Sequence, residues 1–187
     1  QLITPPARAM GGATGNELTG PFPGAEMVPD GDRSGAMAVT IDAPPEQVWP
    51  WLVQMGWNRG GGWYSWDHLD NAGRSSARRV HPEWQDLRCG DTLEYWLPGA
   101  GPRNAYTVAT LEENRFLGLH GLSDLRGGQT LDPRRPRPPA YLEGWWGGFQ
   151  LTELPGRRTR LLVSGYQAGR PRRVAQFVYF WLFPPVV

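Results

Sequence analysis

Side chains that can move protons gather in one glycine-rich stretch of the chain. Residues 54–71 read QMGWNRGGGWYSWDHLDN and place a phenol, Tyr64, three positions before a carboxylate, Asp67. At the mouth of a ligand site, such a pair would hydrogen-bond a substrate or transfer a proton to it. Asp67 is also suited to capping or bracing the short helix predicted over 66–71, because a carboxylate accepts hydrogen bonds from free helix amides. The residues alone leave both roles open.

Two histidines elsewhere in the chain are further candidates for acid–base chemistry. His81 and Glu83 lie two positions apart, and a histidine beside a carboxylate is the composition of a general base held by an orienting acid. Glu83 is equally suited to a surface ion pair with a nearby arginine. His120 lies in a strand predicted over 116–122, where side chains alternate between the two faces. If Phe116 points inward, so does His120; a core or rim histidine is the alternative.

Tryptophan is unusually frequent, with ten among 187 residues. Large rings dominate buried area, so many of these tryptophans must serve the core. The excess favours a flat, partly aromatic ligand, whose carbonyl or enolate oxygens Arg59 and Tyr64 would bind. The predicted ligand-binding set is Arg59, Trp63, Trp66, Trp84, Trp96 and Trp146.

The composition argues against several classes of protein. All 19 basic residues are arginine, which excludes Schiff-base chemistry and disfavours a phosphate-binding loop, since both need lysine. Cys89 is the only cysteine, and no two histidines have the i, i+4 spacing of a helical zinc site, so we expect neither a metal nor an organic cofactor. Aromatic residues gather before residue 97 and the arginine excess follows residue 124, whereas sites for single-stranded nucleic acids interleave the two. No nucleic-acid partner is expected.

The elements that must position these residues predict one α+β domain. Residues 1–33, rich in Gly and Pro, indicate an extended arm, and residues 34–187 form the folded domain. A strand over 35–41 precedes a helix that begins at two prolines and ends at Gly56. An antiparallel meander follows, and a helical pattern resumes past Pro171. The strands of the meander are predicted over 92–97, 106–111, 116–122, 148–154 and 160–166.

Three segments of the sequence resemble the SRPBCC, or START-like, superfamily. Residues 41–56 (IDAPPEQVWPWLVQMG) are similar to its opening helix, and residues 61–67 (GGWYSWD) and 82–91 (PEWQDLRCGD) are similar to a bacterial subgroup. The superfamily includes polyketide cyclases and lipid-transfer domains. The resemblance implies a helix-grip fold, in which a curved antiparallel sheet wraps around a long C-terminal helix and leaves an internal cavity. It implies no single reaction, since this fold hosts carriers and enzymes alike, and the insert 132–139 (DPRRPRPP) departs from the pattern.

The residues and the resemblance together predict a protein that binds a hydrophobic, partly aromatic small molecule. In an enzymatic version, a polyketide-type cyclase or dehydratase, His120 or His81 and Asp67 move protons while Tyr64 binds substrate oxygens. The alternative is a non-catalytic lipid carrier or sensor at a membrane surface. We expect a cytoplasmic protein. The apolar segment 177–187 (FVYFWLFPPVV), predicted as part of a buried helix, would supply any peripheral membrane contact.

Overall fold

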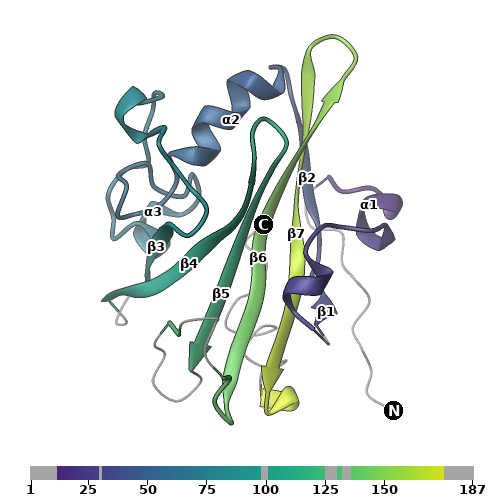
Figure 1. The fold of residues 1–187 in the computed structure, drawn as a ribbon. Helices are drawn as coiled ribbons and strands as arrows, with labels where there is room; N and C mark the ends of the chain where they lie inside the picture. Colours follow the sequence, from purple (N-terminus) through teal and green to yellow (C-terminus); the bar gives the residue numbers. More distant parts are fainter. Residues whose placement is uncertain (1–11, 30, 98–100, 125–129, 132–135, 175–187) are drawn as a thin grey trace.

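A single antiparallel sheet of seven strands organises the molecule (Figure 1). The computed structural model describes residues 12–29, 31–97, 101–124, 130–131 and 136–174. The strand order is β1-β7-β6-β5-β4-β3, and β2 pairs with β7 beside β1. The strands are β1 (Asp32–Arg33), β2 (Met37–Ile41), β3 (Thr92–Leu97), β4 (Gly101–Glu112), β5 (Phe116–Asp124), β6 (Tyr141–Leu154) and β7 (Arg158–Arg170).

Two short helices precede β1 and three lie between β2 and β3, which confirms the predicted α+β class with an antiparallel sheet. They are α1 (Gly15–Thr19), η1 (Ala25–Met27), α2 (Pro45–Val53), α3 (Asp67–Asp70) and η2 (Pro82–Trp84). Past Pro171 a helical turn covers residues 172–174. The remainder of the predicted C-terminal helix, with the apolar segment 177–187, lies outside the described residues. Within the part of the chain that is described, no helix is long and apolar enough to cross a membrane.

Helix α2 covers one face of the sheet. It begins at Pro45, where a missing amide costs nothing, and Glu46 lies in its first turn. Its buried side chains pack with Leu117 and Leu119 of β5. Trp51, which the apolar periodicity placed on the buried face, is only half-buried. The α2 side chains in this core are Val48, Trp49, Leu52 and Val53.

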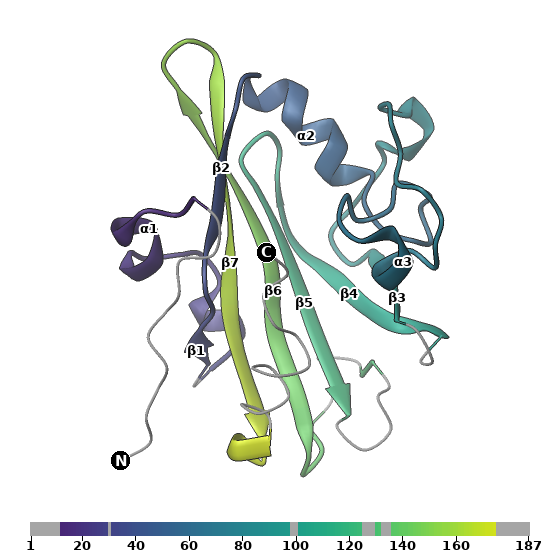
Figure 2. The same cartoon turned by 180° about the vertical axis from the view of Figure 1, so that it is seen from behind.

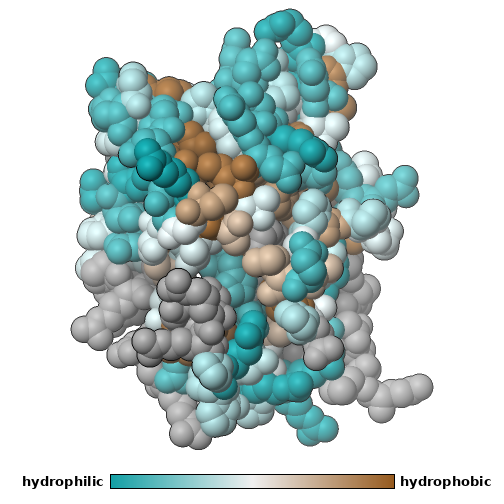
Figure 3. Space-filling model, viewed as in Figure 1, coloured by the Kyte–Doolittle hydropathy of each residue, from teal (hydrophilic) through white to brown (hydrophobic). Residues whose placement is uncertain are grey.

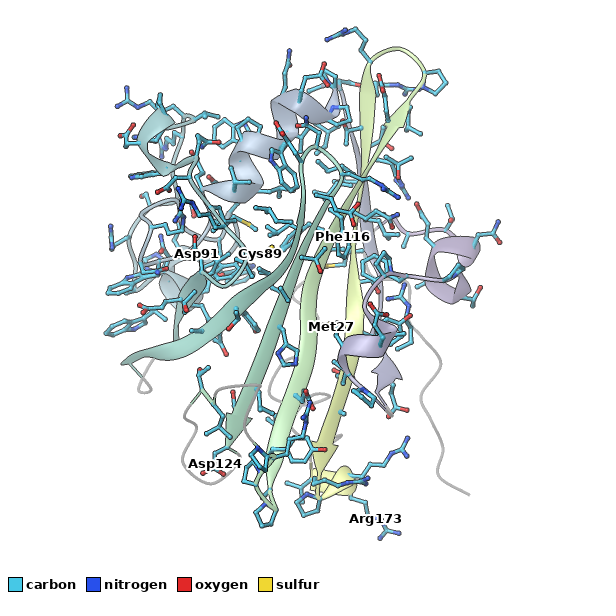
Figure 4. The ribbon with its side chains drawn as sticks, viewed as in Figure 1. Met27, Cys89, Asp91, Phe116, Asp124 and Arg173 are labelled. Atoms are coloured by element: carbon cyan, nitrogen blue, oxygen red, sulfur yellow. The ribbon has the colours of Figure 1, made fainter. Side chains whose placement is uncertain are left out.

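The N-terminal arm covers the opposite face, as Figures 1 and 2 show from the two sides. Because strand side chains alternate, Phe116 points away from Leu117 and the α2 core. Phe116 meets Phe22 of the arm edge to face, with ring centroids 5.9 Å apart. Met27 packs against the same cluster, and Figure 4 shows it near Phe116. In Figure 3, which views this side, hydrophobic surface forms a central band with hydrophilic residues around it.

The arm, expected to be extended, contains α1 and η1 and is anchored to β7. Thr14 and Glu17 form a capping box that starts α1. Glu17 receives two hydrogen bonds from Arg160, each 2.8 Å long, along one edge of the guanidinium group. This pairing lowers the pKa of Glu17 to about 2. The Tyr166 hydroxyl also donates to the Phe22 carbonyl over 3.0 Å, so residues 12–33 are an integral part of the sheet's cover.

The outer edge of β3 is closed by a side chain. Asn58 accepts a hydrogen bond from the Glu94 amide at 3.0 Å and donates one to the Thr92 carbonyl at 2.8 Å. Its amide group therefore imitates a neighbouring strand at an edge that would otherwise offer unpaired backbone groups. This contact fixes the glycine-rich loop against the sheet.

Strand β6 begins seven residues earlier than the sequence predicted, at Tyr141 rather than residue 148. Its first half is the glycine-rich stretch EGWWGG, a composition that is unfavourable for a strand. A register shift with both neighbours between Trp145 and Gly148 marks a bulge, which accommodates these glycines.

Candidate functional site

The glycine-rich loop 56–62 folds back against the end of α2. Gly56 and Gly62 form an isolated antiparallel bridge that closes the loop. Gly61 lies so close to α2 that a Cβ atom there would be 1.8 Å from the Gln54 carbonyl oxygen. Glycine is therefore required by packing at Gly61.

Gln54 is the hub of the hydrogen bonds beneath this loop and is fully buried. Its Oε1 accepts a hydrogen bond from the His81 backbone amide over 3.0 Å. This contact sets the orientation of the side-chain amide, so Nε2 is the group that faces Tyr64 Oη at 2.6 Å and the Arg79 carbonyl at 3.1 Å. An amide nitrogen donates and does not accept. The Tyr64 oxygen is consequently the acceptor, and its own hydroxyl hydrogen points elsewhere.

Tyr64 is held in a backbone conformation that non-glycine residues seldom adopt, with φ of 54°. Its amide donates to Ser76 Oγ over 3.1 Å, and Ser76 Oγ donates in turn to Asp67 over 2.6 Å. Its ring meets the Trp51 ring edge to face at 5.8 Å. Burial raises the pKa of Tyr64, with the Gln54 hydrogen bond opposing the change, so the phenol stays protonated at neutral pH. The site thus holds a fixed hydroxyl donor whose ring is 38% exposed.

Asp67 takes the bracing role that the sequence left as one of two alternatives. Its carboxylate accepts hydrogen bonds from Ser76 Oγ and from the Ser76 amide, the latter over 3.1 Å. Both contacts tie the start of α3 to the strand-like segment that supports Tyr64. In this structure Asp67 positions Tyr64 through Ser76, and the predicted proton transfer by Asp67 has no geometric support.

Three aromatic rings form a wall beside the loop. Trp63 lies edge to face with Tyr106 at 5.9 Å and with Tyr95 at 6.3 Å, while Tyr95 and Tyr106 stack at 5.0 Å. The Trp63 indole donates to the Glu94 carbonyl over 2.9 Å, which fixes its ring. Burial raises the pKa of Tyr95, although a hydrogen bond with Tyr106 opposes it. We call Trp63, Tyr95 and Tyr106 the aromatic wall.

Next to this wall, the α2 side of the sheet carries a group of small residues, with Leu142 and Gln167 of the described residues on the same face. Gly121 lies directly under the Tyr106 ring, whose carbon would be 2.8 Å from an added Cβ atom. Gly121 pairs with Gly144 in the adjacent strand, and paired residues share a face. The alternation that places Leu117 and Leu119 on this face also places these small residues there. We call them the glycine floor: Gly121, Ser123, Gly144, Gly165 and Gly169.

Arg59, His81 and Trp84 form a separate cluster on the loops. Arg59 Nη2 donates to the Trp84 carbonyl and to the Asp86 carboxylate, both over 2.8 Å. The His81 ring stacks on the Trp84 ring at 3.9 Å, and its Nδ1 lies 3.0 Å from Glu83. The predicted His81–Glu83 pair therefore exists, but its carboxylate is largely exposed. Arg59 thus binds the Trp84 carbonyl and Asp86 through Nη2.

The other tryptophans of the predicted binding set are dispersed. Trp66 is 58% exposed at the start of α3. Trp96 lies against Trp57, with ring centroids 5.7 Å apart. Trp146 belongs to β6, and its side chain lies outside the described residues. Of the predicted tryptophans whose side chains are described, Trp63 is the one that belongs to the aromatic wall.

His120 is buried, but on the face of the sheet that the arm covers. It shares the side of β5 that carries Phe116, opposite the α2 core. Its Nε2 lies 3.0 Å from Glu143, which also accepts from Arg137 Nε over 2.8 Å. Burial opposes ionisation of Glu143, yet the hydrogen bonds from His120 and Arg137 outweigh it and lower the pKa of Glu143. His120 thus belongs to a hydrogen-bonded cluster with Glu143 and Arg137, on the opposite face of the sheet from the aromatic wall.

Sequence reasoning missed several groups that determine the site. Gln54 and Ser76 are polar residues whose partners lie far along the chain, so no local pattern marks them. Glu143 is a lone carboxylate inside a strand, which is itself a signal, since charged residues are seldom buried without partners. Tyr95 of β3 and Tyr106 of β4 are diagonal neighbours across the two strands, since Tyr106 pairs with Leu93. Their contact can be inferred only when the register of the strands is known. The described residues contain no cluster of three or more candidate metal ligands.

Comparison with protein-family models finds no match, and neither does comparison with curated proteins. Two solved structures are similar in part. A protein from Arthrobacter aurescens, solved by NMR, is 16% identical with a TM-score of 0.44, over 79% of this chain and 75% of that one. A Mesorhizobium loti protein, solved by crystallography, is 20% identical with a TM-score of 0.40, over 78% of this chain and 86% of that one. The function therefore rests on the site itself.

Proposed function

We propose that this chain is a START-like protein that binds a hydrophobic, partly aromatic small molecule over the glycine floor, against the aromatic wall. The strand order supports the helix-grip assignment, because β2 and β7 are neighbours and three short helices separate β2 from the meander. This order agrees with the SRPBCC-like segments of the sequence.

The observation that carries the proposal is the contrast between the floor and its surroundings. Elsewhere on this face the sheet buries leucine and valine against α2, whereas at the floor adjacent strands present glycine to glycine. Paired glycines in two neighbouring strands provide no side chains for packing and have low strand propensity. A flat ligand placed there would gain ring contacts from Trp63 and Tyr106 and would replace the missing side chains.

Tyr64 supplies the polar contact in this account. Its hydroxyl hydrogen is turned away from Gln54, so it is available to donate to a carbonyl or phenolic oxygen of the ligand. The same donor would polarise a carbonyl group in a polyketide-type cyclisation or dehydration. Non-catalytic binding is the better supported function, since His120 and Asp67 are hydrogen-bonded within the protein.

Binding can be tested with a propionyl-dimethylaminonaphthalene dye (Prodan), a flat ketone whose emission reports on polarity and hydrogen bonding. We expect the wild-type protein to bind it with a blue-shifted emission. Gly121→Ala should weaken binding by about tenfold or more, because the new methyl group forces the Tyr106 ring off the sheet. Gly15→Ala is the matched control, since a Cβ atom there meets nothing within 4 Å. Equal affinity of wild type and Gly121→Ala would refute the placement of the ligand.

The contribution of Tyr64 is tested with the same dye and its analogue that lacks the carbonyl group. Tyr64→Phe should weaken binding of the ketone by about tenfold, the value of one hydrogen bond in a desolvated site. Binding of the carbonyl-free analogue should not change. If both dyes bind Tyr64→Phe as they bind wild type, Tyr64 is not the polar contact.

A further inference from the structure

Arg33 is a half-buried arginine on the arm side of the sheet, opposite the glycine floor. It lies in β1 and pairs with Tyr166 of β7. Its guanidinium group lies over the Phe22 ring, 4.5 Å from the centroid, and over the Tyr166 ring at 5.4 Å. Nη1 donates to Ser164 Oγ and, over 3.2 Å, to the Gly165 carbonyl. One part of the group is therefore satisfied by neutral oxygens and aromatic faces.

The other two nitrogens of Arg33, Nε and Nη2, are buried and have no hydrogen-bond partner among the described residues. Together they form the edge of the guanidinium plane that binds a carboxylate through two parallel hydrogen bonds. Two other arginines of this chain use this very edge. Arg160 presents Nε and Nη2 to Glu17, and Arg137 presents the same two atoms to Glu143. Arg33 has the same edge, but no carboxylate of the described residues binds it.

Nearby acidic groups do not supply that carboxylate. Asp32, the neighbouring residue, accepts hydrogen bonds from Arg172 over 2.9 and 3.1 Å. Among the described residues no carboxylate forms an ion pair with Arg33, whereas Arg59, whose Nε also lacks a partner, does have Asp86. Burial lowers the pKa of Arg33, and Tyr166 opposes the change. A buried charged donor without a partner is costly, so its retention calls for an occupant.

We propose that the Nε–Nη2 edge of Arg33 is the binding site of a carboxylate group carried by a small molecule. The Phe22 ring beside the guanidinium group belongs to an apolar cluster, which suits an acid with a hydrocarbon part. Solvent does not reach the two nitrogens, so the carboxylate enters when the arm around Phe22 moves away from β7. Once bound, it holds the arm against the sheet. This site is separate from the glycine floor and does not depend on the function proposed for it.

Thermal unfolding with decanoate, decanol and acetate tests the proposal, at constant ionic strength and below the micelle concentration of decanoate. Decanoate should raise the midpoint of wild-type unfolding more than decanol does, because only the acid carries the carboxylate. If acetate acts as well, the site takes the carboxylate without the chain; if decanoate alone acts, the hydrocarbon part is also bound. Equal effects of decanoate and decanol, with none from acetate, overturn the proposal.

Variants locate the effect. Arg33→Gln should abolish the advantage of decanoate over decanol, corresponding to an affinity at least about tenfold weaker. Arg172→Gln, which removes an exposed arginine of the same region, should retain the advantage. Gly121→Ala should also retain it, which separates this site from the glycine floor. An advantage that persists in Arg33→Gln contradicts the proposal.

A measurement on the unaltered protein covers the case in which Arg33→Gln does not fold. The Nε–H NMR signal of Arg33 should move downfield on addition of decanoate, since a side-on carboxylate accepts a hydrogen bond from that group. The Nε–H signal of Arg160, already paired with Glu17, should stay in place. An unmoved Arg33 signal at saturating decanoate refutes the site.

Discussion

Gln54 shows how one buried side chain sets the chemistry of another residue. The His81 amide fixes the orientation of the Gln54 amide, and this orientation forces Tyr64 to accept rather than donate. The result is a phenol whose free hydrogen is aimed away from the protein's own acceptor. Neither residue carries a charge, so the effect depends entirely on hydrogen-bond geometry.

Gln54→Leu tests this arrangement at the residue scale. The substitution conserves volume roughly but leaves the buried His81 amide without its acceptor and frees the Tyr64 ring. We expect the free energy of unfolding to fall by about 2 kcal/mol or more, the cost of a buried unsatisfied polar group. Urea unfolding measures the change. Tyr64→Phe removes only one hydrogen bond of the network and should lower the free energy of unfolding by less. If Gln54→Leu lowers it no more than Tyr64→Phe does, Gln54 is not the hub.

Gly61→Ala tests the close approach of the loop to α2. A methyl group would overlap the Gln54 carbonyl oxygen, and backbone cannot move aside as a flexible side chain can. We expect destabilisation of about 1–3 kcal/mol, typical of overpacking, again measured by urea unfolding. Gly15→Ala, in open space, should leave stability close to wild type. Similar stabilities of the two variants would mean that the loop is not packed as described.

At the scale of elements, the sequence predicted most strands of the sheet but not the helices of the arm. The meander of strands was predicted, because alternation and turn residues are local signals. Helix α1 was missed although Thr14 and Glu17 form a capping box, a signal that is readable in sequence. The burial of His120 was predicted as one alternative, but the face of the sheet on which it lies was not. Alternation along a strand tells which residues share a face; it does not tell which other element covers that face.

The arm should loosen in acid. The pKa of Glu17 is lowered from 4.5 to about 2 by Arg160, so the unfolded state binds a proton more readily than the folded state. The resulting stabilisation is complete above pH 4.5 and is lost as pH falls toward 2. Glu17→Gln lacks it at every pH. The difference in unfolding free energy between wild type and Glu17→Gln should therefore shrink over this range.

Glu46→Gln provides a control for this titration. Glu46 pairs with Arg157 at an exposed position, where ion pairs contribute little. Its effect on stability should be small. A constant difference between wild type and Glu17→Gln from pH 5 to pH 2 would show that the Arg160 pair does not hold the arm.

At the scale of the whole molecule, the sheet separates two chemically different faces. The α2 face carries the aromatic wall, the glycine floor and Tyr64 on the adjoining loop. The arm face carries ionisable side chains. Arg33 has no carboxylate partner among the described residues, and the buried Glu143 binds His120 and Arg137. Neutral ligands with an oxygen acceptor are expected on the first face, and an acid is expected on the second.

The central claim is that a flat hydrophobic ligand lies on the glycine floor, and backbone NMR during a titration with the propionyl naphthalene dye tests it most directly. We expect the amide signals of Gly121, Gly144, Gly165 and Gly169 to shift together with the Trp63 indole signal. The signals of the arm, such as those of Glu17 and Phe22, should remain unchanged. Shifts confined to the arm, or a titration that moves no floor signal, would contradict it.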